Sequence, residues 1–181
     1  GDAAGTDNNF FVTGSVGSKD TATKGTAVFA GDVVVSGSLY ARQRHIKTHK
    51  YTANSSNTKR YMRFEGSSAD SSPENNNKFM VPADGRLLKV FIRTTGTGDP
   101  VTSMGATVIG FHKASDTDKN LSATATETQP VDVSDVDTAF SVTFTSAASF
   151  SEGDIVGISV NPTNNHGNAN LTCIWEFDFV S

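Results

Sequence analysis

His45 and His49 are the first residues whose type and spacing suggest metal binding. Four residues apart, they would share one face of a helix, but in a strand they would lie about 13 Å apart at about 3.3 Å per residue. One ion cannot bridge that distance. The neighbouring Arg44, Lys47 and Lys50 would also repel a cation. We therefore expect no metal ion at this pair.

Asp116, Asp118 and Asn120 have the spacing of the first ligands of a calcium loop. The segment SDTDKN lacks the glycine and the distal glutamate that such a loop needs. A solvated turn explains these residues better, and we expect neither a metal nor a cofactor.

Nucleophilic catalysis would require a serine or cysteine supported by a base. The chain is rich in serine but has no Gly-x-Ser-x-Gly elbow, and Val35-Ser36-Gly37-Ser38 does not fit that pattern. Cys173 alternates with Leu171 and Trp175, which predicts an inert thiol on an apolar strand face. As the single cysteine, it also excludes an intrachain disulfide.

Glu176 and Asp178 share one face of the last predicted strand. Such a carboxylate pair could serve a glycosidase only if a cleft formed around it. We expect a solvated outer face instead, no catalytic residues, and no enzymatic activity.

Charge is distributed unevenly along the chain. The window from Val33 to Phe64 holds seven basic residues and no acidic one, whereas six basic and fifteen acidic residues follow from Glu65 onward. A solvated strand, a polyanion-binding patch and a docking surface for an acidic protein are the possible interpretations. We favour docking or plain solvation. The predicted docking patch consists of Arg42, Arg44, Lys47 and Lys50.

The overall composition excludes several classes of partner. The formal charge of -4 argues against a dedicated nucleic-acid binder. No apolar run has the length of a membrane span, and no signal peptide opens the chain, so we expect no membrane insertion.

Residues 1–41 read as an arm rather than a domain. They are rich in Gly, Asp, Asn, Thr and Ser, with apolar patches at Phe10, Phe11 and Val12 and at Val33, Val34 and Val35. Such a segment is expected to order only against a partner or sister chains.

Residues 42–181 read as one domain of short strands. Alternating apolar residues are separated by turn residues such as Ala83-Asp84-Gly85 and Glu152-Gly153-Asp154, and no helical periodicity is evident. Eight or nine strands at this spacing predict an all-β antiparallel sandwich or jelly roll, with a meander as the alternative.

Two resemblances extend this interpretation. The turn and strand at 150–160, followed by the apolar strand to Val180, resemble the last two strands of tumour-necrosis-factor and C1q-like jelly rolls. The stretches 79–90, 108–113 and 150–162, with Trp175-Glu176-Phe177, are similar to C-terminal domains of structural proteins in marine tailed phages. Val-Ser-Gly-Ser-Leu segments like the one at 35–39 precede receptor-binding or decoration domains in phage fibres.

These resemblances imply a non-enzymatic, homotrimeric protein of the virion surface: a capsid decoration or tail-fibre knob with a jelly-roll domain, which contributes to host attachment. Its partners would be sister chains, a phage capsid or tail protein and a host surface glycan. The alternative is a glycan-binding β-sandwich module of a secreted or cell-surface protein. We expect one of Trp175 and Phe177 to face the core and the other a sister chain. The residues assigned on this basis are Phe10, Phe11, Val12, Val33, Val34 and Val35 for virion attachment; Trp175, Phe177 and Phe179 for the core or trimer interface; and Asp99, Asn164, Asn165 and His166 for a glycan-binding loop.

Overall fold

A computed structural model describes residues 42–51, 57–64, 69–73, 77–95, 103–115 and 120–179. The arm at 1–41, with its predicted attachment residues Phe10 to Val12 and Val33 to Val35, lies outside the described residues, and so does Asp99.

The described part of the chain is almost entirely β-structure, as predicted. A single 3-10 turn, η1 (Ser146–Ala148), begins at a Thr145 side chain that accepts a hydrogen bond from the Ala147 amide. No helix of the described residues is long and apolar enough to cross a membrane. The strands are β1 (Arg42–Tyr51), β2 (Arg60–Met62), β3 (Ala69–Asp70), β4 (Phe79–Met80), β5 (Gly85–Thr94), β6 (Gly105–Ala114), β7 (Glu127–Val133), β8 (Phe140–Thr143), β9 (Ser149–Phe150), β10 (Ile155–Pro162) and β11 (Ala169–Asp178).

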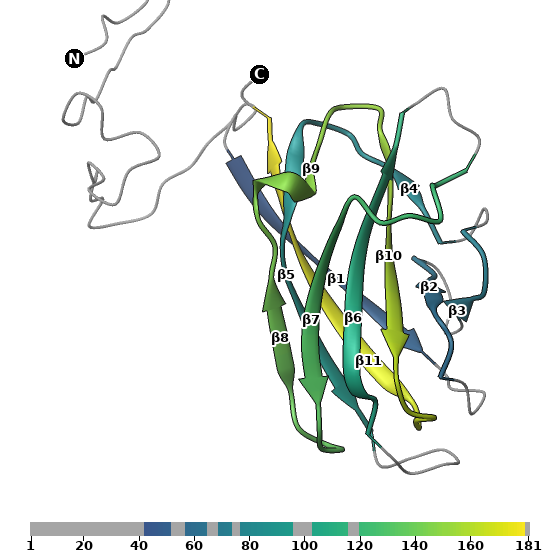
Figure 1. The fold of residues 1–181 in the computed structure, drawn as a ribbon. Coiled ribbons are helices and arrows are strands. Elements are labelled where there is room, and N and C mark those ends of the chain that lie inside the picture. Colours follow the sequence, from purple (N-terminus) through teal and green to yellow (C-terminus); the bar gives the residue numbers. More distant parts are fainter. Residues whose placement is uncertain are drawn as a thin grey trace, which may run out of the picture. The chain divides into compact units, whose positions relative to one another are not determined.

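The strands form two antiparallel sheets that face each other as a sandwich (Figure 1). Sheet A has the order β1-β11-β5-β8, and β9 also pairs with β5. Sheet B has the order β3-β2-β10-β6-β7, and β4 also pairs with β10. The expected all-β sandwich is therefore confirmed.

Strand pairing follows a nested order. When the two-residue strands β3, β4 and β9 are set aside, the first of the remaining strands pairs with the last (β1 with β11) and the second with the second-last (β2 with β10). Further inside the chain, β5 pairs with β8 and β6 with β7. The chain is thus paired like one long hairpin. The two halves of this hairpin pass together from one sheet to the other.

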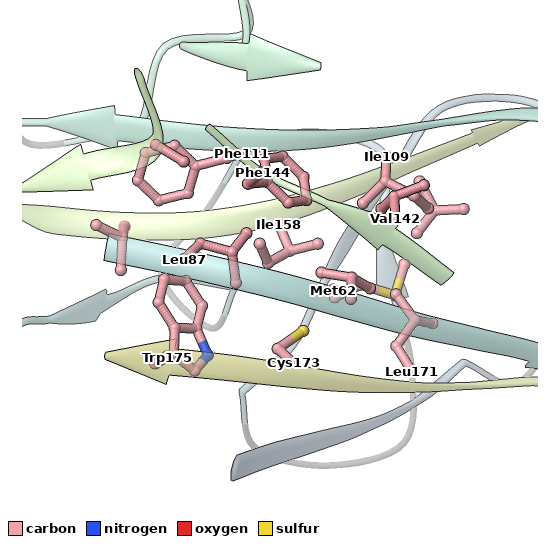
Figure 2. Packing of buried hydrophobic residues seen from close by; sticks show 14 of the residues in the cluster. Met62, Leu87, Ile109, Phe111, Val142, Phe144, Ile158, Leu171, Cys173 and Trp175 are labelled. Carbon is pink, nitrogen blue, oxygen red and sulfur yellow. The ribbon is translucent and has the colours of Figure 1, made fainter. Parts of the chain in front are cut away.

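The core lies between the sheets and is rich in aromatic rings (Figure 2). Leu171, Cys173 and Trp175 alternate along β11 and all point inward, as the sequence predicted. Trp175 is fully buried, with its ring centroid 5.4 Å from that of Phe79 and 5.9 Å from that of Phe150. Aromatic pairs at these distances add to the stability gained from burial.

Phe177 joins Trp175 in the core. It is only 5% exposed, because residues two apart on a strand share a face. The expectation that one of these two residues faces a partner chain is therefore wrong. Phe179 follows the end of β11, is half-buried and stacks on Phe177 with a centroid distance of 6.0 Å.

The segment 120–126 covers the outer face of sheet B. The Ala123 carbonyl accepts hydrogen bonds from Lys59 Nζ (2.6 Å) and from the Tyr61 hydroxyl (3.2 Å). A Cβ added at Gly157 would lie 2.7 Å from the backbone carbonyl oxygen of Asn77 and 2.4 Å from Cδ1 of Leu121, so glycine permits the close approach of both segments. Strand β10 is consequently buried on both of its faces along Ile155 to Val160.

Candidate functional site

The outer face of sheet A carries a concentration of basic side chains, which we call the cationic face. Strands β1 and β5 flank β11 on its two sides and supply these side chains. The alternation of each strand sends every second residue outward, away from the core. The basic residues of the cationic face are Arg42, Arg44 and Lys50 of β1 and Arg86, Lys89 and Arg93 of β5.

A β-bulge places the basic residues of β5 on this face. Ile174 of β11 pairs with Lys89, whereas Trp175 pairs with Leu87, so Leu88 is the extra residue. The bulge keeps both Leu87 and Val90 in the core, each fully buried. Arg86 and Lys89 therefore both point outward although they are three residues apart.

Glu176 lies at the centre of an arginine cluster on the cationic face. Its carboxylate is 3.2 Å from Nε of Arg86, 3.5 Å from Nε of Arg44 and 4.0 Å from Nε of Arg42. Arg42 also binds Asp178 through a 2.8 Å hydrogen bond. The Glu176 side chain is only 10% exposed, so the expectation of a fully solvated acidic pair is wrong for this residue. Arginines from two other strands compensate its burial.

The cationic face retains a surplus of positive charge after this pairing. Its six basic side chains face the two carboxylates of Glu176 and Asp178. Asp137, at one border, binds Arg93 at 3.0 Å. Counting all three acids, the face has a formal charge of about +3, whereas the whole chain has -4. The rest of the molecule is correspondingly acidic.

Besides its charged residues, the cationic face carries apolar and hydroxyl-bearing side chains on all three strands. Ile46 pairs directly with Ile174 and is 68% exposed, and Thr48 pairs with Thr172. Phe91 is half-buried, and Nζ of Lys89 lies 4.6 Å from its ring centroid, within the range of a cation–π contact. The face thus combines charge, hydroxyl groups and one aromatic surface.

The predicted docking patch is divided between two faces of β1. Arg42, Arg44 and Lys50 belong to the cationic face, but Lys47 does not, because its odd position points it to the opposite side of the strand. Lys47 pairs with Cys173, whose side chain is in the core, yet Lys47 itself is exposed at the border of the sheet.

Three basic residues of the cationic face, Arg86, Lys89 and Arg93, were not predicted from the sequence. They stand in the strand RLLKVFIRT, where only the adjacent Leu87 and Leu88 indicate the bulge that aligns them.

The histidine pair of β1 has the geometry of a strand. His49 is buried, its Nδ1 lies 2.8 Å from the Arg63 carbonyl, and burial is the main cause that lowers the pKa of its ring. His45 is exposed, with its ring edge toward Phe177 at 5.3 Å. Among the described residues, no three His, Cys, Asp or Glu side chains come together in a way that could hold a metal ion.

His112 and Ser159 form a buried polar pair under the segment 120–126. Nδ1 of His112 lies 2.9 Å from the Ser122 carbonyl, which can only accept, so this nitrogen carries the proton. Nε2 therefore accepts from the Ser159 hydroxyl at 2.8 Å. A base oriented on a serine resembles a catalytic dyad, but both residues are at most 2% exposed. Their evident task is to hold the covering segment on sheet B.

The predicted glycan loop is only partly available at the surface. Asn164 and Asn165 are exposed, but His166 is fully buried. Its Nδ1 donates to the Gly167 carbonyl at 2.6 Å, and its ring lies 5.0 Å from that of Tyr51. The inclusion of His166 in a surface loop is therefore wrong, because this ring closes one end of the core.

Of these sites, the cationic face is open to solvent, whereas the paired histidine and serine are enclosed. The geometry of the cationic face and the strand order of the sheets are therefore the basis for a functional proposal. No protein-family model matches this chain, and no curated protein matches its sequence.

Proposed function

We propose that this chain is a non-enzymatic structural protein of a virion surface, that its sandwich is a jelly roll, and that it assembles as a homotrimer. The observation that carries the proposal is the nested strand order. Numbered as eight strands, sheet A reads 1-8-3-6 and sheet B reads 2-7-4-5. Two interleaved Greek keys of eight strands define a jelly roll. The resemblance of 150–180 to jelly rolls of the tumour-necrosis-factor and C1q type implies the same order.

The non-enzymatic part of the proposal is supported by the state of the candidate catalytic groups. Ser159 and His112 are enclosed beneath the segment 120–126. Glu176, the carboxylate of a candidate glycosidase pair, is bound by arginines on both sides. This carboxylate is thus occupied by ion pairs with arginines of two neighbouring strands.

The assembly part of the proposal assigns different tasks to the two segments of the chain. The arm at 1–41, with Phe10 to Val12 and Val33 to Val35, attaches the protein to a capsid or tail protein. Phe179 is the remaining aromatic candidate for a contact between sister chains, since Trp175 and Phe177 are used in the core. Three copies would hold the particle more tightly than one, without a strong contact at each site.

Light scattering of the purified full chain tests the trimer. We expect a mass about three times the 19.1 kDa of one chain. A stable monomer over a range of protein concentrations would reject the trimer.

The virion assignment is tested separately. We expect the protein among the components of purified particles by mass spectrometry, and an antibody against residues 42–181 to label intact particles in electron micrographs. Failure of both measurements would reject a virion-surface location even if the protein were a trimer.

A further inference from the structure

We infer that the cationic face of sheet A is a binding surface for an acidic polysaccharide. This inference goes beyond the proposed function, and it does not require the trimer or the virion, because every residue of the face belongs to one chain. It relocates carbohydrate binding from the loop at 164–166 to the flat outer surface of β1, β11 and β5.

The charge of the cationic face is positive and is arranged in two rows. The basic residues of β1 and those of β5 form two rows separated by β11, so the rows are about 10 Å apart at two strand spacings. The face has a formal surplus of about +3 on a chain of charge -4. An anionic chain lying along the strands would meet positive charge on both of its sides.

Besides its basic residues, the face carries hydroxyl and apolar groups. Thr48 and Thr172 are paired across β1 and β11, and their hydroxyls suit the hydroxyl groups of a sugar. The half-buried ring of Phe91 offers an apolar surface to the C–H groups of a pyranose, and Ile46 and Ile174 extend that surface. A ligand that is at once anionic, rich in hydroxyls and partly apolar satisfies all three features.

A second copy of this chain is a poorer occupant of the same face. Two cationic faces packed together would bring like charges into contact, which is destabilising unless each is neutralised. Nucleic acid is also a poorer occupant, since its affinity would depend on dense phosphate neutralisation. Glu176 and Asp178 lie within the face and would repel closely spaced phosphates, whereas a polyuronate such as polygalacturonate carries only one charge per sugar.

The experiment measures binding of the full chain to polygalacturonate and to heparin by biolayer interferometry over a series of salt concentrations. Uncharged dextran and a random-sequence DNA duplex serve as comparison ligands. The test variant is Lys50→Gln with Lys89→Gln, which removes one charge from each row. Lys50→Gln alone is compared with Lys47→Gln as its matched control, because each removes one charge from β1 and the two lie on opposite faces.

We expect the wild-type chain to bind at least one of the two acidic polysaccharides, more weakly as salt increases, and not to bind dextran. The double variant should lower the affinity about two- to twentyfold, since an exposed ion pair contributes up to about 1 kcal/mol. Lys47→Gln should change it less than Lys50→Gln alone does. A loss shared equally by the control would show a net-charge effect and overturn the inference.

Three other results would also overturn it. One is the absence of binding to both acidic polysaccharides at low salt. Another is DNA binding tighter than polysaccharide binding, which would assign the face to nucleic acid. The third is a change of the light-scattering mass in the double variant, which would assign the face to a contact between copies. The mass of the wild-type chain tests the proposed trimer independently, so the two failures can be told apart.

Discussion

Acidification should destabilise the domain through His112, and this effect can be worked out from the structure. The ring is fully buried, donates to the Ser122 carbonyl and accepts from Ser159. Burial, with Lys59 nearby as a lesser cause, lowers the pKa of this ring to about 4 from 6.5, although its hydrogen bonds act in the opposite direction. A protonated ring could no longer accept from the Ser159 hydroxyl.

Acidification lowers the free energy of unfolding because the unfolded state binds the proton at a higher pH than the folded state does. The unfolded chain takes up the proton near pH 6.5 and the folded chain only near pH 4. The stability that His112 contributes is therefore fully present above pH 6.5 and is lost as the pH falls from 6.5 to about 4. Between pH 7 and pH 4.5, the loss in free energy of unfolding amounts to about 2 kcal/mol. Burial lowers the pKa of His49 and His166 too, so these residues act in the same direction.

Urea unfolding at pH 7, 6, 5 and 4.5 measures this loss, with fluorescence of Trp175 as the probe, because it is the single tryptophan and is buried. His112→Gln should be less stable at pH 7 but should lose about 2 kcal/mol less than the wild type on acidification. His45→Gln, at an exposed position of β1, is the control and should follow the wild type. Parallel pH profiles for the wild type and His112→Gln would refute the reasoning.

Other perturbations test the core and its cover. Trp175→Ala should cost about 3 to 5 kcal/mol in urea unfolding and leave the mass of the assembly unchanged; a lower mass with normal stability would place this ring at an interface. Gly157→Ala should cost about 1 to 3 kcal/mol, because its Cβ would lie 2.7 Å from the backbone oxygen of Asn77 and would displace Leu121, and should speed amide hydrogen exchange in the segment 120–126. Cys173, whose pKa burial raises to about 12, should react with a thiol reagent at pH 8 only after urea is added, so rapid labelling of the native protein would contradict its assigned burial.

The presence of the longer strands could be predicted from the sequence. The shortest strands and the pairing of distant strands could not. The alternation of apolar residues that predicts short strands in residues 42–181 is confirmed by strands such as β5 and β10. Strands β3 and β9 were not predicted, because two residues contain no period to read. The nested order depends on pairings such as Arg42 with Asp178, which join the two ends of the domain. A single sequence does not encode such contacts in any local pattern.

The candidate site was partly predictable by the same alternation rule. Applied to Leu171, Cys173 and Trp175, the rule gave their shared core face correctly. Applied consistently, it would also have separated Lys47 from Arg44 and kept Phe177 beside Trp175.

Other features of the site needed the tertiary structure. Glu176 reads as a surface acid in the sequence, and only arginines from β1 and β5 explain its burial. The pair of His112 and Ser159 joins residues 47 positions apart.

The two proposals together make a prediction about salt. If the chain is a trimer and the cationic face binds polysaccharide, sister chains have to meet elsewhere, because three faces of about +3 packed on one axis would repel each other. Salt weakens the repulsion between like charges, with a screening length of about 10 Å at 0.1 M and about 3 Å at 1 M. A trimer built on the cationic face would therefore tighten strongly as salt is added, and a trimer built on other residues would not. Dissociation constants measured by analytical ultracentrifugation at 0.05 M and 0.5 M sodium chloride should differ little. A large gain in trimer affinity at high salt would show that this face is a subunit contact and is closed to any glycan.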